Sequence, residues 1–258
     1  MIRMDGYRAV LEKEIIESWR TYRLVYLCAL FVVVGIAAPV LTRYLPELVR
    51  ALGEPGAEIG FGETGVPEVV DLLLAALLQA GALAAVLMTM GTVAGEKERG
   101  TAWLVLSKPV GRAAFLWAKL VALGMIFALA TALAVLAAWL YTSLLFGQPP
   151  ILTWLQMAFN AWLSTMVYVS MTFLGSVVAS SSLGAAGFGL GAIVGLSLAS
   201  AVTSLNPWLP TGLGEVAKAV GLEEASADLD PARTVAVAFG VIIVSMLVAW
   251  WRFRRQEL

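Results

Sequence analysis

Gly95-Glu-Lys-Glu-Arg-Gly-Thr101, continued by Leu106-Ser-Lys-Pro-Val-Gly-Arg112, is a charged stretch between two long apolar runs. The whole chain of 258 residues is 60% hydrophobic and only 14% charged. Soluble domains are closer to half apolar and a quarter charged. The apolar residues also gather in blocks of roughly 20, the length that one helix needs to cross a bilayer. The composition therefore predicts an all-α integral membrane protein.

Outward from the charged stretch, six apolar blocks are long enough to span the membrane. We predict membrane-spanning helices at residues 24–44, 69–93, 119–146, 154–180, 184–205 and 234–251. The fourth and fifth blocks are almost continuous, but about fifty residues is twice what one crossing needs, so we count two spans. Residues 1–258 then form a single transmembrane domain.

The basic residues predict the orientation of these spans. Six crossings place both termini on the same side of the membrane. If that side is cytoplasmic, the inner segments carry about three times as many Lys and Arg residues as the outer ones, as the positive-inside rule requires. We therefore expect a multi-pass protein of the cell membrane with both termini in the cytoplasm.

The segments that flank the spans have patterns of their own. Apolar residues recur at helical spacing over residues 5–22, which predicts an amphipathic helix at the membrane interface within residues 1–23. Residues 46–68 are rich in Gly, Pro and Glu and predict an irregular outer loop. Residues 206–232 predict a short outer helix. Asp230 and Pro231 then predict an N-cap and a first helical position for the last span.

The chain offers little catalytic chemistry. It has no Gly-x-x-x-x-Gly-Lys-Ser/Thr loop for nucleotide phosphates, so we expect no ATP hydrolysis by this chain. It has no histidine and one cysteine, Cys28, and shows no metal motif. No carboxylate lies in the middle of a span, which argues against a proton-coupled transporter. We predict a subunit that is not an enzyme and has no nucleic-acid partner.

Two sets of residues inside the spans leave their role open. Gly187, Gly191 and Gly195 recur every four residues, which lets helices approach closely. They predict either packing within one chain or a functional role, as a subunit interface or as a moving helix near the transport path. The polar residues Gln79, Gln156 and Asn160 predict either hydrogen bonds between helices or part of a substrate path.

The charged stretch at residues 95–112 is more than a solvated loop. Gly95 and Gly100 enclose side chains of both signs, and an apolar ridge follows over residues 102–106. Residues 107–111 then form a turn, and Arg112 and Lys119 lie near the start of the third span. We expect a helix–turn–helix on the inner surface that contacts a partner.

This stretch resembles the corresponding motif of the ABC-2 type permeases of ATP-binding cassette transporters, and the outline of the whole chain is similar to theirs. The resemblance implies the ABC-2 exporter (type V) fold, with an amphipathic connecting helix before the first span. It also implies a coupling helix between the second and third spans that docks on an ATPase subunit. The motif is similar in permeases for nitrous oxide reductase copper maturation and for antibiotic export, so it selects no substrate.

Several assignments follow from this resemblance. The ATPase-docking residues would be Glu96, Lys97, Glu98, Arg99, Gly100 and Thr101, while Arg112 and Lys119 would anchor the base of the third span. The functional unit would contain two permeases and two ATPase subunits. ATP and Mg²⁺ would be bound by the partner ATPase, and this chain would bind no cofactor.

The predicted function is the permease subunit of an ATP-driven transporter, with export as the expected direction. One alternative is a membrane scaffold that supplies energy to a maturation partner outside the membrane. A secondary transporter is a further alternative, but it needs coupling carboxylates or matched broken helices, and the sequence shows neither.

Overall fold

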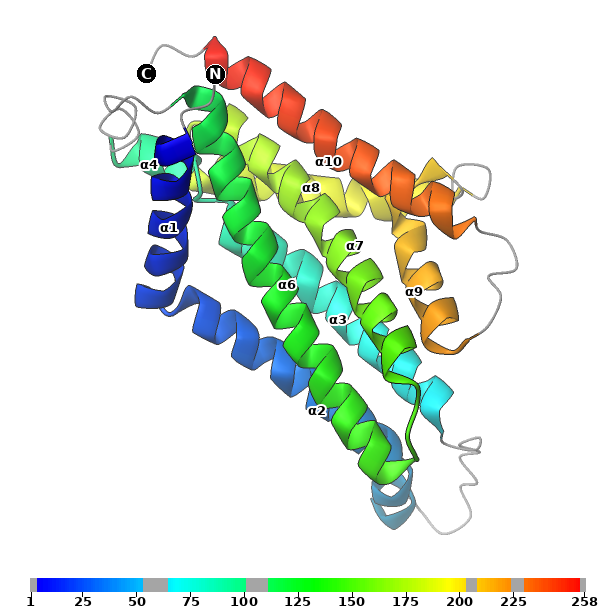
Figure 1. Cartoon of the computed structure of the whole chain (residues 1–258). Coiled ribbons are helices and arrows are strands. Elements are labelled where there is room, and N and C mark those ends of the chain that lie inside the picture. Colours follow the sequence, from blue (N-terminus) through cyan, green and yellow to red (C-terminus); the bar gives the residue numbers. More distant parts are fainter. Residues whose placement is uncertain (1–3, 53–64, 101–110, 203–207, 224–229, 256–258) are drawn as a thin grey trace.

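The computed structural model describes residues 4–52, 65–100, 111–202, 208–223 and 230–255, and every regular element in these ranges is helical (Figure 1). Six of the helices are long and apolar enough to cross a membrane. The predicted all-α membrane fold with six spans is thereby confirmed. The elements are α1 (Met4–Arg20), α2 (Arg23–Leu52), α3 (Val66–Thr89), α4 (Ala94–Glu98), α6 (Arg112–Leu145), α7 (Ile151–Val178), α8 (Ser182–Ser200), η2 (Pro210–Gly212), α9 (Leu213–Gly221) and α10 (Pro231–Arg254).

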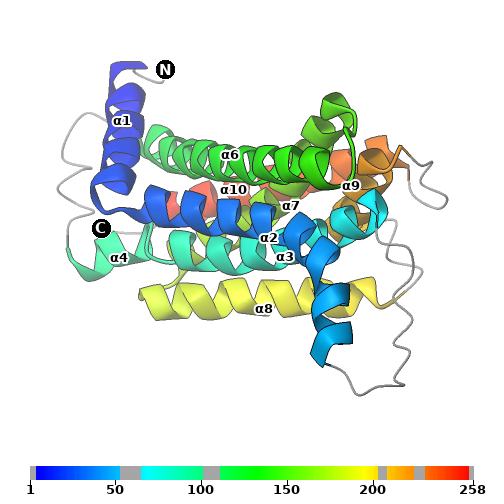
Figure 2. The ribbon, with the colours of Figure 1, turned by 90° about the horizontal axis from the view of Figure 1, so that it is seen from below.

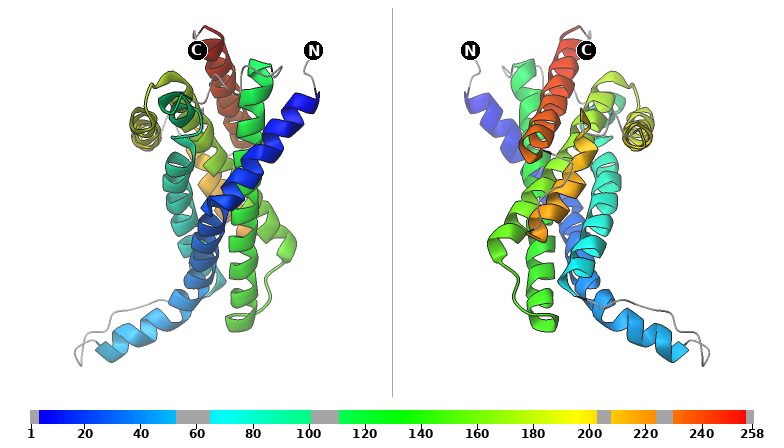
Figure 3. Two further views of the ribbon diagram at one scale, coloured as in Figure 1. Left: turned by 90° about the vertical axis from the view of Figure 1, so that its left-hand side faces the viewer. Right: turned by 90° about the vertical axis from the view of Figure 1, so that its right-hand side faces the viewer.

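Several helices extend beyond the apolar blocks from which they were predicted. Helix α2 continues to Leu52, so residues 46–52 are helical where an irregular loop was expected. Figure 3 shows the far part of α2 turning away from the other helices. This helix contains Pro39 and Pro46, and proline removes a hydrogen bond from a helix and bends it. Helix α6 starts at Arg112, before its apolar block, so its first turns carry the polar residues that contact α1 and α10.

Helix α7 is the central helix of the bundle. In its most apolar 18-residue window 72% of the residues are buried, compared with 28% in α2 and α10 and 22% in α8. A membrane helix that contacts other helices on all sides is shielded from lipid, whereas a peripheral helix keeps an open face. Helices α2, α8 and α10 therefore have surface available for lipid or for another protein chain.

Helices α2 and α6 approach each other closely. A β-carbon added to Gly35 would lie 2.2 Å from the carbonyl oxygen of Ala134. The rings of Phe31 and Phe127 meet edge to face on the same two helices, with centroids 6.4 Å apart. Gly35 permits this approach because only glycine has no side chain at that point.

The two ends of the bundle differ in character. Helix α1 runs across one end, beside α4 and the chain termini, as Figures 1 and 2 show. At the opposite end α9 packs against α7 and α3, and Lys218 of α9 pairs with Asp71 of α3 at 2.7 Å. The last span begins as predicted: the Asp230 side chain accepts a hydrogen bond from the backbone of Ala232, and Pro231 follows the cap.

Candidate functional site

The candidate site is α4, the described part of the charged stretch. Helix α3 ends at Thr89, residues 90–93 form a turn, and α4 covers only five residues. Gly100 follows with a φ of 65°, a left-handed conformation that suits glycine and ends the helix. The two glycines thus have distinct roles, because Gly95 lies inside α4, where it is buried. Thr101 and the rest of residues 101–110 lie outside the described residues.

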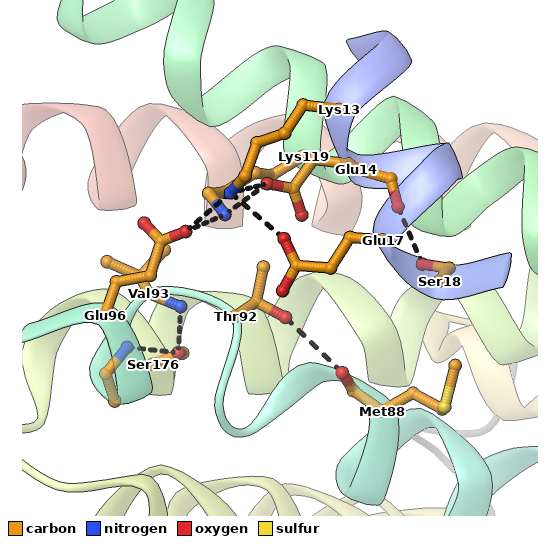
Figure 4. A network of polar contacts seen from close by, with 11 residues as sticks. Lys13, Glu14, Glu17, Ser18, Met88, Thr92, Val93, Glu96, Lys119 and Ser176 are labelled. Atoms are coloured by element: carbon orange, nitrogen blue, oxygen red, sulfur yellow. Dashed lines mark hydrogen bonds and ion pairs between the residues drawn. The ribbon is translucent and has the colours of Figure 1, made fainter. Parts of the chain in front are cut away.

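Ser176 of α7 holds the break between α3 and α4 in place. Its hydroxyl accepts hydrogen bonds from the backbone N–H groups of Val93 and Ala94, both at 3.0 Å (Figure 4). It also donates one to the carbonyl of Met90. A break in a buried helix exposes backbone groups that need partners. The Ser176 hydroxyl satisfies three of these groups, so the position of α4 is fixed relative to α7.

Two side chains of α4 reach the turn between α7 and α8. Lys97 donates hydrogen bonds to the carbonyls of Val177 and Ala179, which lie at the C-terminal end of α7. A positive charge at this end of a helix is favourable, because the last carbonyls have no partner within the helix. Glu98 accepts a hydrogen bond of 2.6 Å from the hydroxyl of Ser182, the first residue of α8. Helix α4 is therefore attached to both the fourth and the fifth span.

Glu96 points in the opposite direction, into the bundle. Its side chain is 9% exposed and accepts a hydrogen bond of 2.9 Å from Lys119, whose side chain is only 2% exposed. Glu14 of α1 contacts the same Lys119 ammonium at 2.7 Å. Lys13 adds contacts to Glu14, Glu17 and Glu96 at 3.1 to 3.3 Å (Figure 4). These five side chains, Lys13, Glu14, Glu17, Glu96 and Lys119, are called the ion-pair network below.

The ion-pair network shifts the pKa values of Glu14 and Lys13 on α1. Burial favours the neutral form of Glu14, but the ammonium of Lys119 outweighs it and holds the pKa of Glu14 below its usual range. Burial likewise favours neutral Lys13, but Glu14 and Glu96 outweigh it and raise the pKa of Lys13. Both shifts favour the charged forms of Glu14 and Lys13. The network joins α1, α4 and α6 by direct ion pairs.

The two predicted anchor residues contact different neighbours. Lys119 lies inside the ion-pair network, whereas Arg112 is exposed and donates a hydrogen bond of 2.9 Å to the carbonyl of Arg254 at the end of α10. The first turn of α6 is thus linked to α10, and its second and third turns to α1 and α4.

The predicted substrate-path residues do not form one site. Gln156 and Asn160 line a cavity of about 480 Å³ between α7, α9 and α10. The Asn160 amide donates to the carbonyl of Gln156, and its side-chain oxygen has no hydrogen-bond partner among the described residues. Gln79 lies apart, in a cavity of about 380 Å³ between α3, α7 and α8 with Ser164 and Tyr168. A third cavity, beside the ion-pair network, measures about 40 Å³ and suits water rather than an organic substrate.

The predicted glycine stripe faces outward. A β-carbon at Gly187, Gly191 or Gly195 would meet no atom within 4 Å, so these residues do not pack against the rest of the chain. Gly189, which was not predicted, is the closely packed glycine of α8, because a β-carbon there would lie 2.5 Å from the hydroxyl of Thr172. The prediction that the three stripe glycines pack within one chain is therefore wrong for the described residues.

Sequence reasoning missed Lys13, Glu14, Ser176 and Ser182 as parts of this site. One signal was available: Lys119 follows an apolar stretch, and a lysine buried there needs carboxylate partners. The sequence could not say which of its carboxylates those are. No three acidic or cysteine side chains in the described part of the chain come close enough to hold a metal ion.

The comparisons with known proteins agree with this architecture. The family model described as ABC-2 family transporter protein matches residues 8–258. The chain is also 27% identical over 262 residues to the uncharacterized transmembrane protein YxlG of Bacillus subtilis (strain 168), covering 98% of this chain and 99% of that protein. The family match shows that this six-span chain is a transmembrane transport subunit. The chain belongs to the ABC-2 transporter family, whose permeases lie in the cell membrane and work with an ABC ATPase.

Proposed function

We propose that this chain is the permease of an ATP-driven exporter and that its ATPase subunit docks on α4. The position of α4 carries the proposal. Glu98 and Arg99 are exposed on this helix, while polar contacts tie it to α1, α6, α7 and α8. A force applied to the exposed side of α4 would therefore reach four other helices. ATP hydrolysis would take place in the partner, and the termini would be cytoplasmic.

The residues assigned to docking divide into two groups on this proposal. Glu96 is buried in the ion-pair network and Lys97 is occupied by the end of α7, so both would transmit motion. Arg99 would contact the ATPase directly, and Glu98, which is exposed but also accepts the hydrogen bond from Ser182, would both contact the ATPase and pass motion to α8. Gly100 ends the helix beside them. Lys119 would act as the anchor through which motion of α4 reaches α6.

Charge reversal tests the docking assignment. We expect E98R and R99E each to weaken retention of the ATPase at least about tenfold, because like charges that meet across an interface are costly. The measurement is the amount of ATPase that co-purifies with the tagged chain, together with ATP-driven transport in vesicles. The control is E215R, which makes the same charge change as E98R on exposed Glu215 of α9 at the other end of the bundle. If E98R and R99E retained as much ATPase as E215R, docking on α4 would be refuted.

We further propose that two copies form the transport unit and that α8 contributes to their contact. The outward stripe of Gly187, Gly191 and Gly195 supports this proposal, because small exposed residues allow another helix to approach closely. We expect G191C, in a background with Cys28 replaced by serine, to form a disulfide-linked dimer in native membranes under mild oxidation. Cysteine in place of Leu129, which is exposed on α6, is the control and should stay monomeric on a non-reducing gel. Equal cross-linking of both variants would count against α8.

A further inference from the structure

An apolar groove lies between α6, α7 and α10, away from α4 and the ion-pair network. Its volume is about 420 Å³. Its lining includes Trp117, Val121 and Met125 of α6, Trp162 of α7, and Phe239 and Ile243 of α10. The Trp162 indole N–H donates to the carbonyl of Gly124 at 3.0 Å, so the one polar atom of this side chain is already satisfied. The surface that the lining exposes to the groove is apolar throughout, so the groove suits a hydrocarbon chain.

Helices α6 and α10 close the groove at the end near the chain termini. The rings of Phe115 and Phe253 stack there with centroids 5.9 Å apart, and Arg112 donates its hydrogen bond to the carbonyl of Arg254. The guanidinium groups of Arg112 and Arg254 thus come from two helices that touch, and both residues are exposed.

The groove and Arg254 lie on the same face of α10. Ile243, Trp250 and Arg254 are separated by seven and four residues, which keeps them in line along a helix. The Arg254 guanidinium lies over the Trp250 ring, 4.9 Å from its centroid. Eleven residues of helix from Ile243 to Arg254 span roughly 16 Å, about half of the 30 Å hydrocarbon core. The groove therefore lies at the depth of one leaflet's acyl chains, and Arg254 lies at the depth of its headgroups.

Charge indicates which lipid would occupy this place. Helices α6 and α10 contain no Asp or Glu at all, so no acidic side chain on either helix offsets Arg112 and Arg254. Tryptophan favours the same interfacial depth, and arginine pairs well with phosphate oxygens.

We propose that this groove is a binding site for an anionic phospholipid of the leaflet next to the termini. One acyl chain occupies the groove, and the phosphate lies between Arg112 and Arg254. The bound lipid fills the space where α6 and α10 diverge, and so stabilises their contact. The site is independent of the proposed ATPase docking, because it involves a different face of the chain.

Native mass spectrometry of the full-length chain tests the headgroup contact. The probes are phosphatidylglycerol and phosphatidylcholine vesicle lipids with identical acyl chains. We expect tighter retention of phosphatidylglycerol, and a loss of about tenfold in its affinity for the R112Q/R254Q variant. The matched control is R252Q/R255Q, which also removes two arginine charges at the same end of the bundle, both of them at the end of α10. Arg252 is nine residues from Ile243 and so faces the opposite side of the helix, and Arg255 stacks on Trp251 instead. Equal affinity of both double variants would overturn the proposal.

A second variant tests the acyl-chain contact without changing any charge. A128F places a ring in the groove, whereas L129F adds one on the exposed side of α6. We expect A128F alone to weaken retention of both lipids. Unchanged retention in A128F would refute the groove as the acyl-chain site. Displacement of phosphatidylglycerol by glycerol phosphate at equal concentration would show a simple anion site and would also overturn the proposal.

Discussion

Replacing Lys119 with methionine is expected to lower the free energy of unfolding by about 3–5 kcal/mol. The Lys119 side chain is 2% exposed, and its ammonium contacts the carboxylates of Glu14 and Glu96 at 2.7 and 2.9 Å. Methionine keeps most of the volume but removes one of the two cations of the ion-pair network, so Lys13 alone is left to compensate the carboxylates of Glu14, Glu17 and Glu96. Breaking a buried pair by removal of one partner is far more costly than losing an exposed pair.

The measurement is the thermal unfolding midpoint of the purified chain in detergent. For a chain of this size, the loss corresponds to a drop of about 10 °C. The matched control is K218M, since Lys218 and Asp71 form a pair of similar length whose side chains are 47% and 51% exposed. We expect K218M to lower the free energy of unfolding by about 1 kcal/mol or less.

A combined variant separates charge from packing. In K119M/E14Q/E96Q the carboxylates that contact Lys119 become neutral amides, and the charges left in the network are those of Lys13 and Glu17, which pair with each other at 3.1 Å. We expect this variant to recover at least about half of the stability that K119M loses. A triple variant as unstable as K119M would show that Lys119 contributes mainly by packing and by the cation–π contact of its ammonium, 5.0 Å from the centroid of the Phe115 ring.

Replacing Gly35 with alanine is expected to destabilise the chain by about 2 kcal/mol or more. The added methyl group would lie 2.2 Å from the Ala134 carbonyl oxygen, and this contact involves backbone, so no side chain can rotate to relieve it. Helices α2 and α6 would have to move apart, with a loss of packing at Phe31 and Phe127. Alanine has a higher helix propensity than glycine, so a loss of stability in G35A would come from the contact between the helices and not from helix propensity.

Gly240 of α10 provides the matched control for this prediction. A β-carbon at Gly240 would meet nothing within 4 Å, so G240A should be neutral or stabilise the helix by up to about 1 kcal/mol. Both variants can be compared by thermal unfolding and by the yield of folded protein from membranes. Equal behaviour of G35A and G240A would contradict the close approach of α2 and α6.

The predictions from sequence were confirmed where the pattern that supports them lies within one segment of the chain. Six apolar blocks gave six membrane-spanning helices, and the Asp230-Pro231 pair gave the start of α10. Helix ends were less accurate, as in α2, because a helix continues into polar sequence wherever its backbone hydrogen bonds can be made. The motif at residues 95–112 indicated the family, and the match over residues 8–258 agrees with it.

The internal arrangement of the site could not be predicted in the same way. Gln79, Gln156 and Asn160 are equally polar residues in apolar surroundings, yet the structure places Gln79 in a different cavity from the others. The glycine stripe of α8 had two readings, and only the packed bundle shows that its three members face outward while Gly189 faces inward.

The sequence by itself determined the class of protein, the number of spans and the position of the charged stretch. These properties follow from hydropathy and from short patterns, which act within one segment. Only the tertiary structure decided that Glu96 pairs with Lys119 and Glu14, that Ser176 holds the break before α4, and that Gly35 meets Ala134. These contacts join residues far apart in the chain. They depend on how each helix is rotated and packed against its neighbours, which no local pattern specifies.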